Sequence, residues 1–536
     1  MTAGTVTPYR PGQQSGRDGF AQLLRAEWTK FRTVRGWGIG LLVAVLVMLG
    51  LGVFSAAGSS GSCQSTSGGP ARSGQGCFTA PPVGPGGEAV SDSFYLVRQP
   101  LAGNGSITVR VTSLTGLIPS GNGPTNGPTL DTRPGLVPWA KAGIIIKAST
   151  QPGSAYAAMM VTADHGVRMQ DNFTGDTAGP PGAVTASDPR WLRLTRTGDT
   201  ITGYDSADGT HWAQVGTVAL AGLPSTAQAG LFAASPAYQA ISQGLGGGEN
   251  GMIAPSQDTA VFDHVSLSGA SSAGTWTGYY VGAADGSGIG GYHQAGGRFT
   301  VTGSGDIAPA VPGQTGGEDL TATTFLVGTF AGLIALIVVA AMFITAEYRR
   351  GLIRVTLTAS PRRGRVLAAK AIVIGSVAFA AGLVAAAVAM ILGTQLARGR
   401  VYVFPVSWLT ELRMVVGTAA LVAVAAVLAL AVGTMLRRSA AAVTVVIVVI
   451  VLPYLLGVVS VLPAGAADWV LRITPAAAFA VQQAIPQYPQ VTALYSPGGG
   501  GGGYFPLAPW AGFAVLCGWA AVAVAVALVL LRRRDV

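Results

Sequence analysis

Seven cations and a single carboxylate lie within residues 345–370, TAEYRRGLIRVTLTASPRRGRVLAAK, between two long apolar runs. Charged residues make up only 10% of the whole chain, so this segment concentrates them. A segment of this kind can bind an anionic lipid surface, or it can dock a protein partner through mixed charged and apolar side chains. The carboxylate is Glu347, and the cations are Arg349, Arg350, Arg354, Arg362, Arg363, Arg365 and Lys370.

Acidic and imidazole side chains elsewhere form no catalytic pattern. The aspartates between residues 164 and 263 fall mostly in turns, which such residues favour, and their spacing selects no pair for glycoside hydrolysis. Asp171, Asn172 and Asp176 are a weaker candidate calcium site. The sequence therefore predicts no catalytic residue, no metal site and no cofactor bound by this chain. Metal-ligand spacing is also missing among the histidines, which are His165, His211, His264 and His293.

Composition indicates a membrane protein, because 49% of the residues are hydrophobic and the mean hydropathy is +0.47. A helix needs about 20 apolar residues to cross a bilayer, where every backbone polar group must be paired internally. Pro453 lies inside the fifth such segment, where we expect a kink and not an end. Six segments qualify, at about 37–57, 323–346, 367–393, 413–436, 440–463 and 509–531.

Lys and Arg residues flank these spans on one side only, provided that every span crosses. They occupy the arm 1–36, the segment 345–370, the turn at 437–438 and the tail 532–536. Since cationic flanks stay in the cytoplasm, this predicts a multi-pass plasma-membrane protein with both termini cytoplasmic. Residues 58–322 would then be extracytoplasmic. The chain carries a net charge of +10, but residues 58–320 hold 11 basic against 17 acidic residues, so we expect no nucleic-acid partner.

The segment 58–87 is a Ser/Gly/Pro-rich linker that carries Cys63 and Cys77. An extracytoplasmic location permits a disulfide between them, which would stabilise the fold by about 3 kcal/mol in the loop-entropy model. Two free thiols are the alternative. Cys517 lies within the last span, where we expect no chemistry from it.

Residues 88–268 alternate polar and apolar residues in short runs, which indicates an antiparallel β-sandwich. The stretch WLRLTRTGDTITGYDSADGTHWAQVGTV resembles the concanavalin A-like (laminin G-like) jelly rolls. Many relatives bind carbohydrate, so Trp139, Tyr204 and Trp212 are candidate glycan contacts. Core packing is the alternative for Trp191 and Trp212. A β-like, Gly-rich connector, 269–322, would follow the sandwich.

Two motifs resemble the ABC-2 type permeases, the membrane subunits of type-2 ABC exporters. They are the arm LLRAEWTKFRTVRGWGIGLLVAVL and the stretch TAEYRRGLIRVTLTASPRRGRVLAAKAIV. The resemblance covers about 20–57 and 323–531 and includes the six-span layout. It implies a homodimer or paired permease, a separate ABC ATPase that binds the ATP, and a re-entrant pair within 464–508. An all-β jelly roll inserted between helices one and two of an α-helical membrane protein departs from the family's usual short loop.

Two cytoplasmic elements follow from these motifs. In the arm, apolar residues recur at helical spacing among cations, which predicts an amphipathic helix at the inner leaflet; a plain positive flank is the alternative. Its residues are Leu24, Glu27, Trp28, Lys30, Phe31 and Arg32. In the 345–370 segment we expect a short docking helix that starts at Glu347, while binding to anionic headgroups is the alternative. Its residues are Glu347, Tyr348, Arg349, Arg350, Leu352, Ile353 and Arg354.

The sequence thus favours a non-enzymatic permease subunit that exports an amphiphilic or hydrophobic compound. A membrane-anchored protein that binds or senses an extracellular glycan through its sandwich is the alternative. An anchored glycoside hydrolase would need a carboxylate pair that the spacing does not provide.

The predicted topology can be tested with single cysteines placed at Ser206 and Ser360 in intact cells. Only the cysteine at position 206 should react with an impermeant thiol reagent, because position 360 would lie in the cytoplasm. Both should react after the cells are permeabilised. Equal labelling of the two sites in intact cells would overturn the six-span arrangement.

Overall fold

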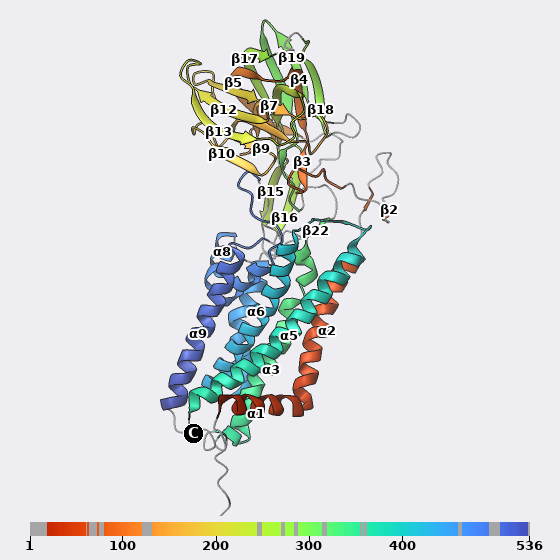
Figure 1. The fold of residues 1–536 in the computed structure, drawn as a ribbon. Coiled ribbons are helices and arrows are strands. Elements are labelled where there is room, and N and C mark those ends of the chain that lie inside the picture. Colours follow the sequence, from red (N-terminus) through yellow and green to blue (C-terminus); the bar gives the residue numbers. More distant parts are fainter. Residues whose placement is uncertain are drawn as a thin grey trace, which may run out of the picture.

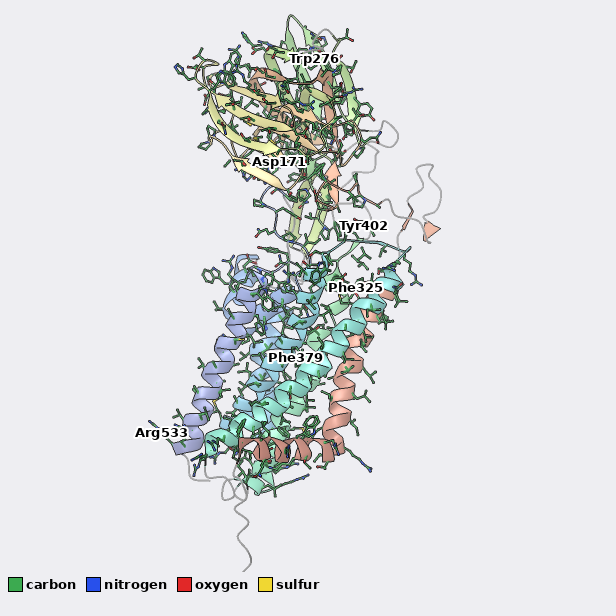
Figure 2. The ribbon with its side chains drawn as sticks, viewed as in Figure 1. Asp171, Trp276, Phe325, Phe379, Tyr402 and Arg533 are labelled. Carbon is green, nitrogen blue, oxygen red and sulfur yellow. The ribbon has the colours of Figure 1, made fainter. Side chains whose placement is uncertain are left out.

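The structure is a computed structural model in which a helical bundle carries a β-rich domain at one end (Figure 1). Side chains fill both parts; the labelled Tyr402 lies where they meet, and Arg533 lies at the opposite end of the bundle (Figure 2). The structure describes residues 19–59, 62–63, 72–73, 80–120, 131–243, 249–269, 274–282, 288–312, 319–353, 356, 362–458, 462, 464–491 and 504–533.

Within the described residues, six helices are long and apolar enough to cross a membrane, one before the β-rich domain and five after it. They lie within two or three residues of the predicted spans at most ends, because a long apolar run fixes a spanning helix closely. The second is extended at its start by a 3₁₀ turn, η1 (Ala322–Leu326). The helices are α2 (Arg35–Gly58), α3 (Thr329–Arg349), α5 (Arg363–Ala397), α6 (Trp408–Leu436), α7 (Ser439–Val458) and α9 (Pro509–Arg533).

Pro453 lies inside α7, which continues past it to Val458, so the proline does not end the helix, as predicted. However, α7 ends five residues before the predicted boundary at 463. Two short helices then follow, α8 (Ala464–Ile473) and the 3₁₀ helix η2 (Pro475–Gln482). All eight residues of η2 are buried, and η2 packs against α6, α7 and α9.

The β-rich domain is built on two antiparallel sheets packed face to face. The first contains β4 (Phe94–Ala102), β7 (Lys141–Lys147), β8 (Tyr156–Thr162), β9 (Val167–Asp171), β10 (Gly175–Ala178), β14 (Thr226–Ala234) and β18 (Thr277–Val281). The second contains β5 (Gly105–Pro119), β6 (Thr132–Pro134), β11 (Arg190–Thr197), β12 (Thr200–Ser206), β13 (Ala213–Ala219), β17 (Gln257–Gly269), β19 (Gly291–Ala295) and β20 (Arg298–Gly303).

The spatial order is β10-β9-β8-β7-β14-β4-β18 in the first sheet and β13-β12-β11-β5-β17-β20-β19 in the second, where β6 pairs with β5. Residues alternate between inward-facing and outward-facing along the strands, and the inward-facing ones form the core between the sheets. Examples are Val109, Ile144, Leu192 and Phe262. The expected all-β sandwich after the first spanning helix is therefore present.

The sandwich extends beyond the expected boundary at 268. Strands β18, β19 and β20 lie in the segment assigned from sequence to a connector. Strand β18 nevertheless pairs with β4, β20 pairs with β17, and β19 pairs with β20. That boundary was wrong because the glycines of this segment form turns between short strands, which hides the alternation. Smaller pairs are β1 (Ser62–Cys63) with β2 (Arg72–Ser73), β15 (Tyr238–Gln243) with β16 (Glu249–Ala254), and β22 (Asp319–Leu320) with β23 (Tyr402–Val403). Cys77 lies outside the described residues, so the disulfide stays a prediction.

Two short strands join the segment where the chain enters the sandwich to the segment where it leaves. Strand β3 (Val90–Asp92) pairs with β21 (Ile307–Pro309), and both lie over the outer face of the seven-stranded sheet. Buried lysines at the two ends of β7 clamp this pair. The amine of Lys147 lies 2.7 Å from the carboxylate of Asp92, and that of Lys141 lies 2.6 Å from Asp306. Both chain connections to the membrane helices are thereby fixed to one strand.

The sandwich also contacts loops of the helical bundle. Ala89 and Ala310, which flank β3 and β21, pack with Phe404 from the α5–α6 connection. The side-chain amide of Gln490 donates to the carbonyl oxygen of Phe173 at 2.9 Å and is buried. The domain therefore sits on the bundle through a packed and hydrogen-bonded junction.

Removal of the buried amine should test the clamp. Lys147→Met leaves Asp92 buried without its cation, so we expect the sandwich of the full chain to lose about 3–5 kcal/mol of stability. Thermal unfolding with limited proteolysis measures this loss. Arg110→Met is the matched control, because its partner Asp263 forms a more exposed ion pair, where such pairs contribute about 0–1 kcal/mol. Similar unfolding of the two variants would contradict a stabilising clamp.

Candidate functional site

Four charged side chains from three helices meet at the end of the bundle away from the sandwich. Lys370 of α5 places its amine 2.6 Å from Glu27 and 2.7 Å from Glu347 of α3. Glu27 belongs to α1 (Phe20–Thr33), which lies across this end of the bundle (Figure 1). Lys30, one turn further along α1, lies 2.7 Å from Glu27 and 3.1 Å from Glu347. We call these four residues the charge cluster.

Three of the four side chains of the charge cluster are buried. Lys370 and Glu27 are each 0% exposed and Glu347 is 7% exposed, so water does not solvate their charges. Two cations and two anions balance, which is the condition under which buried charge is tolerated. The amine of Lys370 also lies 4.8 Å from the centre of the Phe343 ring, and Phe31 of α1 packs edge-on against the same ring.

Lys30 is the half-buried member of the charge cluster. Partial burial lowers its pKa, but the hydrogen bond to Glu27 and the nearby charge of Glu347 outweigh this effect, so the pKa lies above its ordinary value. Lys30 therefore stays cationic at neutral pH and keeps the cluster neutral overall.

The structure corrects the expected start of the docking helix. Glu347 does not begin a helix; it lies in the last turn of α3 and points into the charge cluster, where Lys370 and Lys30 bind it. Sequence reasoning placed it on the surface because it is a lone carboxylate in a basic segment. The same signal, a lone carboxylate near an apolar run with a lysine inside the next span, could have indicated a buried ion pair.

The other predicted docking residues lie in the last turn of α3 or just beyond it. Arg349, Arg350 and Leu352 are exposed, Leu352 by 48%, whereas Ile353 is buried and Tyr348 is half-buried. Arg354 lies outside the described residues. Among the described residues, the exposed part of the predicted docking surface therefore lies at the end of α3 and in the turn that follows it.

The predicted interfacial residues of the arm all lie on α1. Phe31 and Glu27 face the bundle, Leu24 packs at its edge, and Lys30 joins the charge cluster. Trp28 and Arg32 are exposed. The helix expected from the apolar spacing is present, and it packs against α5 as well as α2. The ionic role of Glu27 and Lys30 was missed, since helical spacing alone does not show which partner a charge meets.

Side chains of the sandwich itself already cover two of the candidate glycan contacts. Trp139 is 4% exposed and stacks on His165 at 3.8 Å between ring centres, so its face is already covered. The guanidinium of Arg193 stacks on the ring of Trp212, 3.8 Å from the ring centre. Trp191 and Trp212 are half-buried and absent from the core between the sheets, contrary to the core-packing alternative, and Tyr204 is half-buried too.

Solved structures with detectable similarity align poorly with this chain. A functionally unknown protein from Saccharomyces cerevisiae shares 15% identity at a TM-score of 0.20, with 32% of this chain and 73% of that chain covered. SCP-B, a member of the eqolisin family of peptidases, shares 8% identity at 0.23, with 39% and 98% covered. A GH43 protein from Bacillus licheniformis shares 17% at 0.18, with 34% and 28% covered. These scores assign no fold and no activity.

No curated protein matches the chain. The sequence profile of the ABC-2 family transporter proteins, however, matches residues 146–536, which is more than half of the chain. The match includes five of the six apolar helices together with Glu347 and Lys370 of the charge cluster. The chain is therefore a multi-pass membrane protein that belongs to the ABC-2 family of transporter proteins.

Proposed function

We propose that this chain is the permease subunit of an ABC exporter, which works as a dimer with a separate ATPase. The ATPase binds and hydrolyses ATP, while the permease moves an amphiphilic or hydrophobic compound outward. Membership of the ABC-2 transporter family supports the class of function. Both termini and the charge cluster would face the cytoplasm, and the sandwich would face outward, as the cationic flanks indicate.

The observation that carries this proposal is the position of the charge cluster. It joins α1, α3 and α5 directly beside the exposed turn that carries Leu352. An ATPase docked on that turn would move the end of α3. Because buried ion pairs resist separation, the ends of α1 and α5 would have to move with it. The cluster thus gives a cytoplasmic partner a mechanical connection to three helices.

A buried polar cluster lies at the opposite end of the bundle. The buried side-chain amide of Gln482, at the end of η2, donates to the hydroxyls of Thr329 at 2.9 Å and Thr418 at 3.1 Å. These groups come from η2, α3 and α6, beneath the sandwich. These hydrogen bonds hold η2 against α3 and α6. We assign α8 and η2 to the exit side, where the family resemblance implies a re-entrant pair.

A docking test uses Leu352→Asp in the full chain. A carboxylate there should reduce capture of the partner ATPase at least about tenfold, since the loss of one apolar contact and the burial of an unpaired charge at the interface cost about 1–3 kcal/mol. Membrane insertion and dimerisation should stay unchanged. Leu409→Asp is the matched control, because Leu409 is also exposed but lies at the start of α6. Normal capture by the Leu352 variant, or no ATPase captured by the natural chain, would contradict the proposal.

A coupling test uses Lys370→Met. Two carboxylates then lose their buried cation, so we expect about 3–5 kcal/mol of destabilisation and loss of substrate-stimulated ATP hydrolysis, while the ATPase still binds. Thermal unfolding, ATPase capture and hydrolysis are measured on the same preparation. Arg398→Met, an exposed cation at the end of α5, is the control and should resemble the natural chain. Unchanged stimulation in the Lys370 variant would show that the cluster does not couple.

A further inference from the structure

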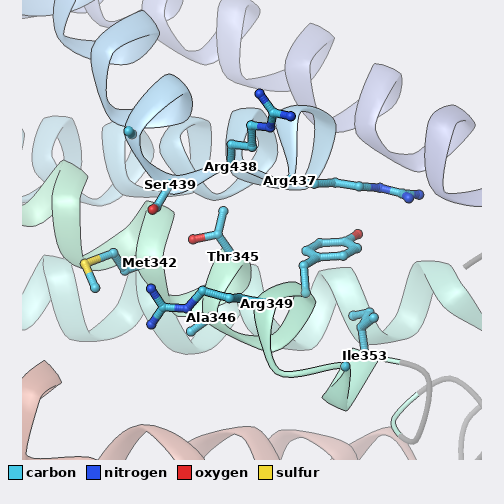
Figure 3. Close-up of a pocket in the computed structure, with 11 residues that line it drawn as sticks. Met342, Thr345, Ala346, Arg349, Ile353, Arg437, Arg438 and Ser439 are labelled. Carbon is cyan, nitrogen blue, oxygen red and sulfur yellow. The ribbon is translucent and has the colours of Figure 1, made fainter.

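A second charged feature lies near the charge cluster but is separate from it. A pocket of about 640 Å³ opens between the last turn of α3 and the turn that joins α6 to α7. Arg349 enters it from α3, and Arg437 and Arg438 come from the opposite turn (Figure 3). The remaining lining residues are Met342, Thr345, Ala346, Tyr348, Gly351, Ile353, Ser439 and Ala440.

The arginines of this pocket lack acidic partners within the described part of the chain. None of the ion pairs between described residues includes Arg349, Arg437 or Arg438, and no Asp or Glu lines the pocket. Glu347 is the nearest carboxylate along α3, but the two lysines of the charge cluster hold it. Three arginines that have no acidic partner among the described residues thus line one cavity, and arginine can donate paired hydrogen bonds to phosphate oxygens.

The backbone of the turn adds to this preference for an anion. Helix α7 starts at Ser439, which lines the pocket, so the positive end of its dipole faces the same cavity. Arg437 adopts a left-handed conformation with φ of 55°, and its guanidinium lies 5.3 Å from the centre of the Tyr348 ring. The turn therefore holds Arg437 against one wall of the pocket.

The lining also indicates that the anion carries an apolar part. Ala346 and Met342 lie about one and two turns before the arginine end of α3, toward the middle of the membrane span, and Met342 is exposed. The pocket thus runs from cations at the helix ends to apolar side chains along the span. A phosphate with attached acyl chains fits both ends, whereas a free anion uses only the first.

We propose that this pocket binds the phosphate headgroup of an anionic phospholipid from the leaflet on the charge-cluster side. The assignment of that leaflet to the cytoplasm rests on the proposed topology, but the binding itself does not. A bound lipid would neutralise the arginines and join the end of α3 to the α6–α7 turn.

Native mass spectrometry of the purified full chain tests this site, with phosphatidylglycerol and phosphatidylcholine of identical acyl chains as probes. The natural chain should retain phosphatidylglycerol selectively. Arg437→Asn combined with Arg438→Gln should weaken that retention about 30-fold, since each juxtamembrane cation contributes about 1 kcal/mol. Asn is chosen at position 437 because it tolerates the left-handed backbone.

The matched control is Arg532→Gln combined with Arg533→Gln, which removes the same charge from exposed positions at the end of α9. It should keep the natural selectivity.

Equal losses in the two double variants would reduce the effect to general surface charge and overturn the site. Competition by inorganic phosphate as effective as that by phosphatidylglycerol would show a free-anion site and overturn the lipid assignment. Loss of ATPase capture with unchanged lipid retention would instead assign the arginines to the partner. The lipid test is independent of the docking test: selective retention of phosphatidylglycerol would still support this site if Leu352→Asp had no effect on ATPase capture.

Discussion

The amine of Lys370 sits in an apolar helical bundle, and its need for carboxylates determines how one end of the protein is built. A cation removed from water costs several kcal/mol unless anions replace its hydration. Glu347 on α3 and Glu27 on α1 supply them, and Lys30 restores neutrality. This requirement explains why α1 lies against the bundle instead of hanging free as a basic arm. The same requirement explains why Glu347 lies inside the basic segment 345–370. Its carboxylate binds Lys370 and Lys30.

The same physical solution recurs in the sandwich. Strand β7 carries a buried lysine at each end, and each binds one aspartate from the segments that lead to the membrane, Asp92 and Asp306. Burial opposes ionisation of such a pair, and it raises the pKa of Asp92 and lowers that of Lys147. The direct contact at 2.7 Å counters this cost. These pairs therefore contribute specificity, because only one placement of the tethers satisfies both lysines.

Sequence patterns predicted elements better than contacts. Apolar runs located the six helices and alternation located most strands, since both periodicities reflect which face is buried. The end of the sandwich was misplaced because glycine turns interrupt the strands after 268. Partners were harder to predict. Glu347 and Lys370 are 23 residues apart, and the sequence carried a signal for that pair, whereas Glu27 and Lys370 are 343 apart and meet only through tertiary packing. The stacking of Trp139 on His165 likewise leaves no periodic signal.

The two sets of buried ion pairs are joined by helices α2 and α3. Each helix connects to the sandwich at one end, and α3 ends in the charge cluster while α2 follows α1 directly. Helix α2 touches η1 and the residue that precedes α3 backbone to backbone: a Cβ on Gly52 would overlap the carbonyl oxygen of Phe325 in η1, and one on Gly328 would overlap that of Met48. Such close contact leaves little room for sliding, because packed interfaces favour discrete arrangements over continuous deformation. A shift at the charge cluster would therefore move α2 and α3 as a pair. On the sandwich side, the described chain resumes after α2 at β3 and leaves toward α3 from β21, and these two strands pair with each other, so both ends of the sandwich meet the bundle as one unit.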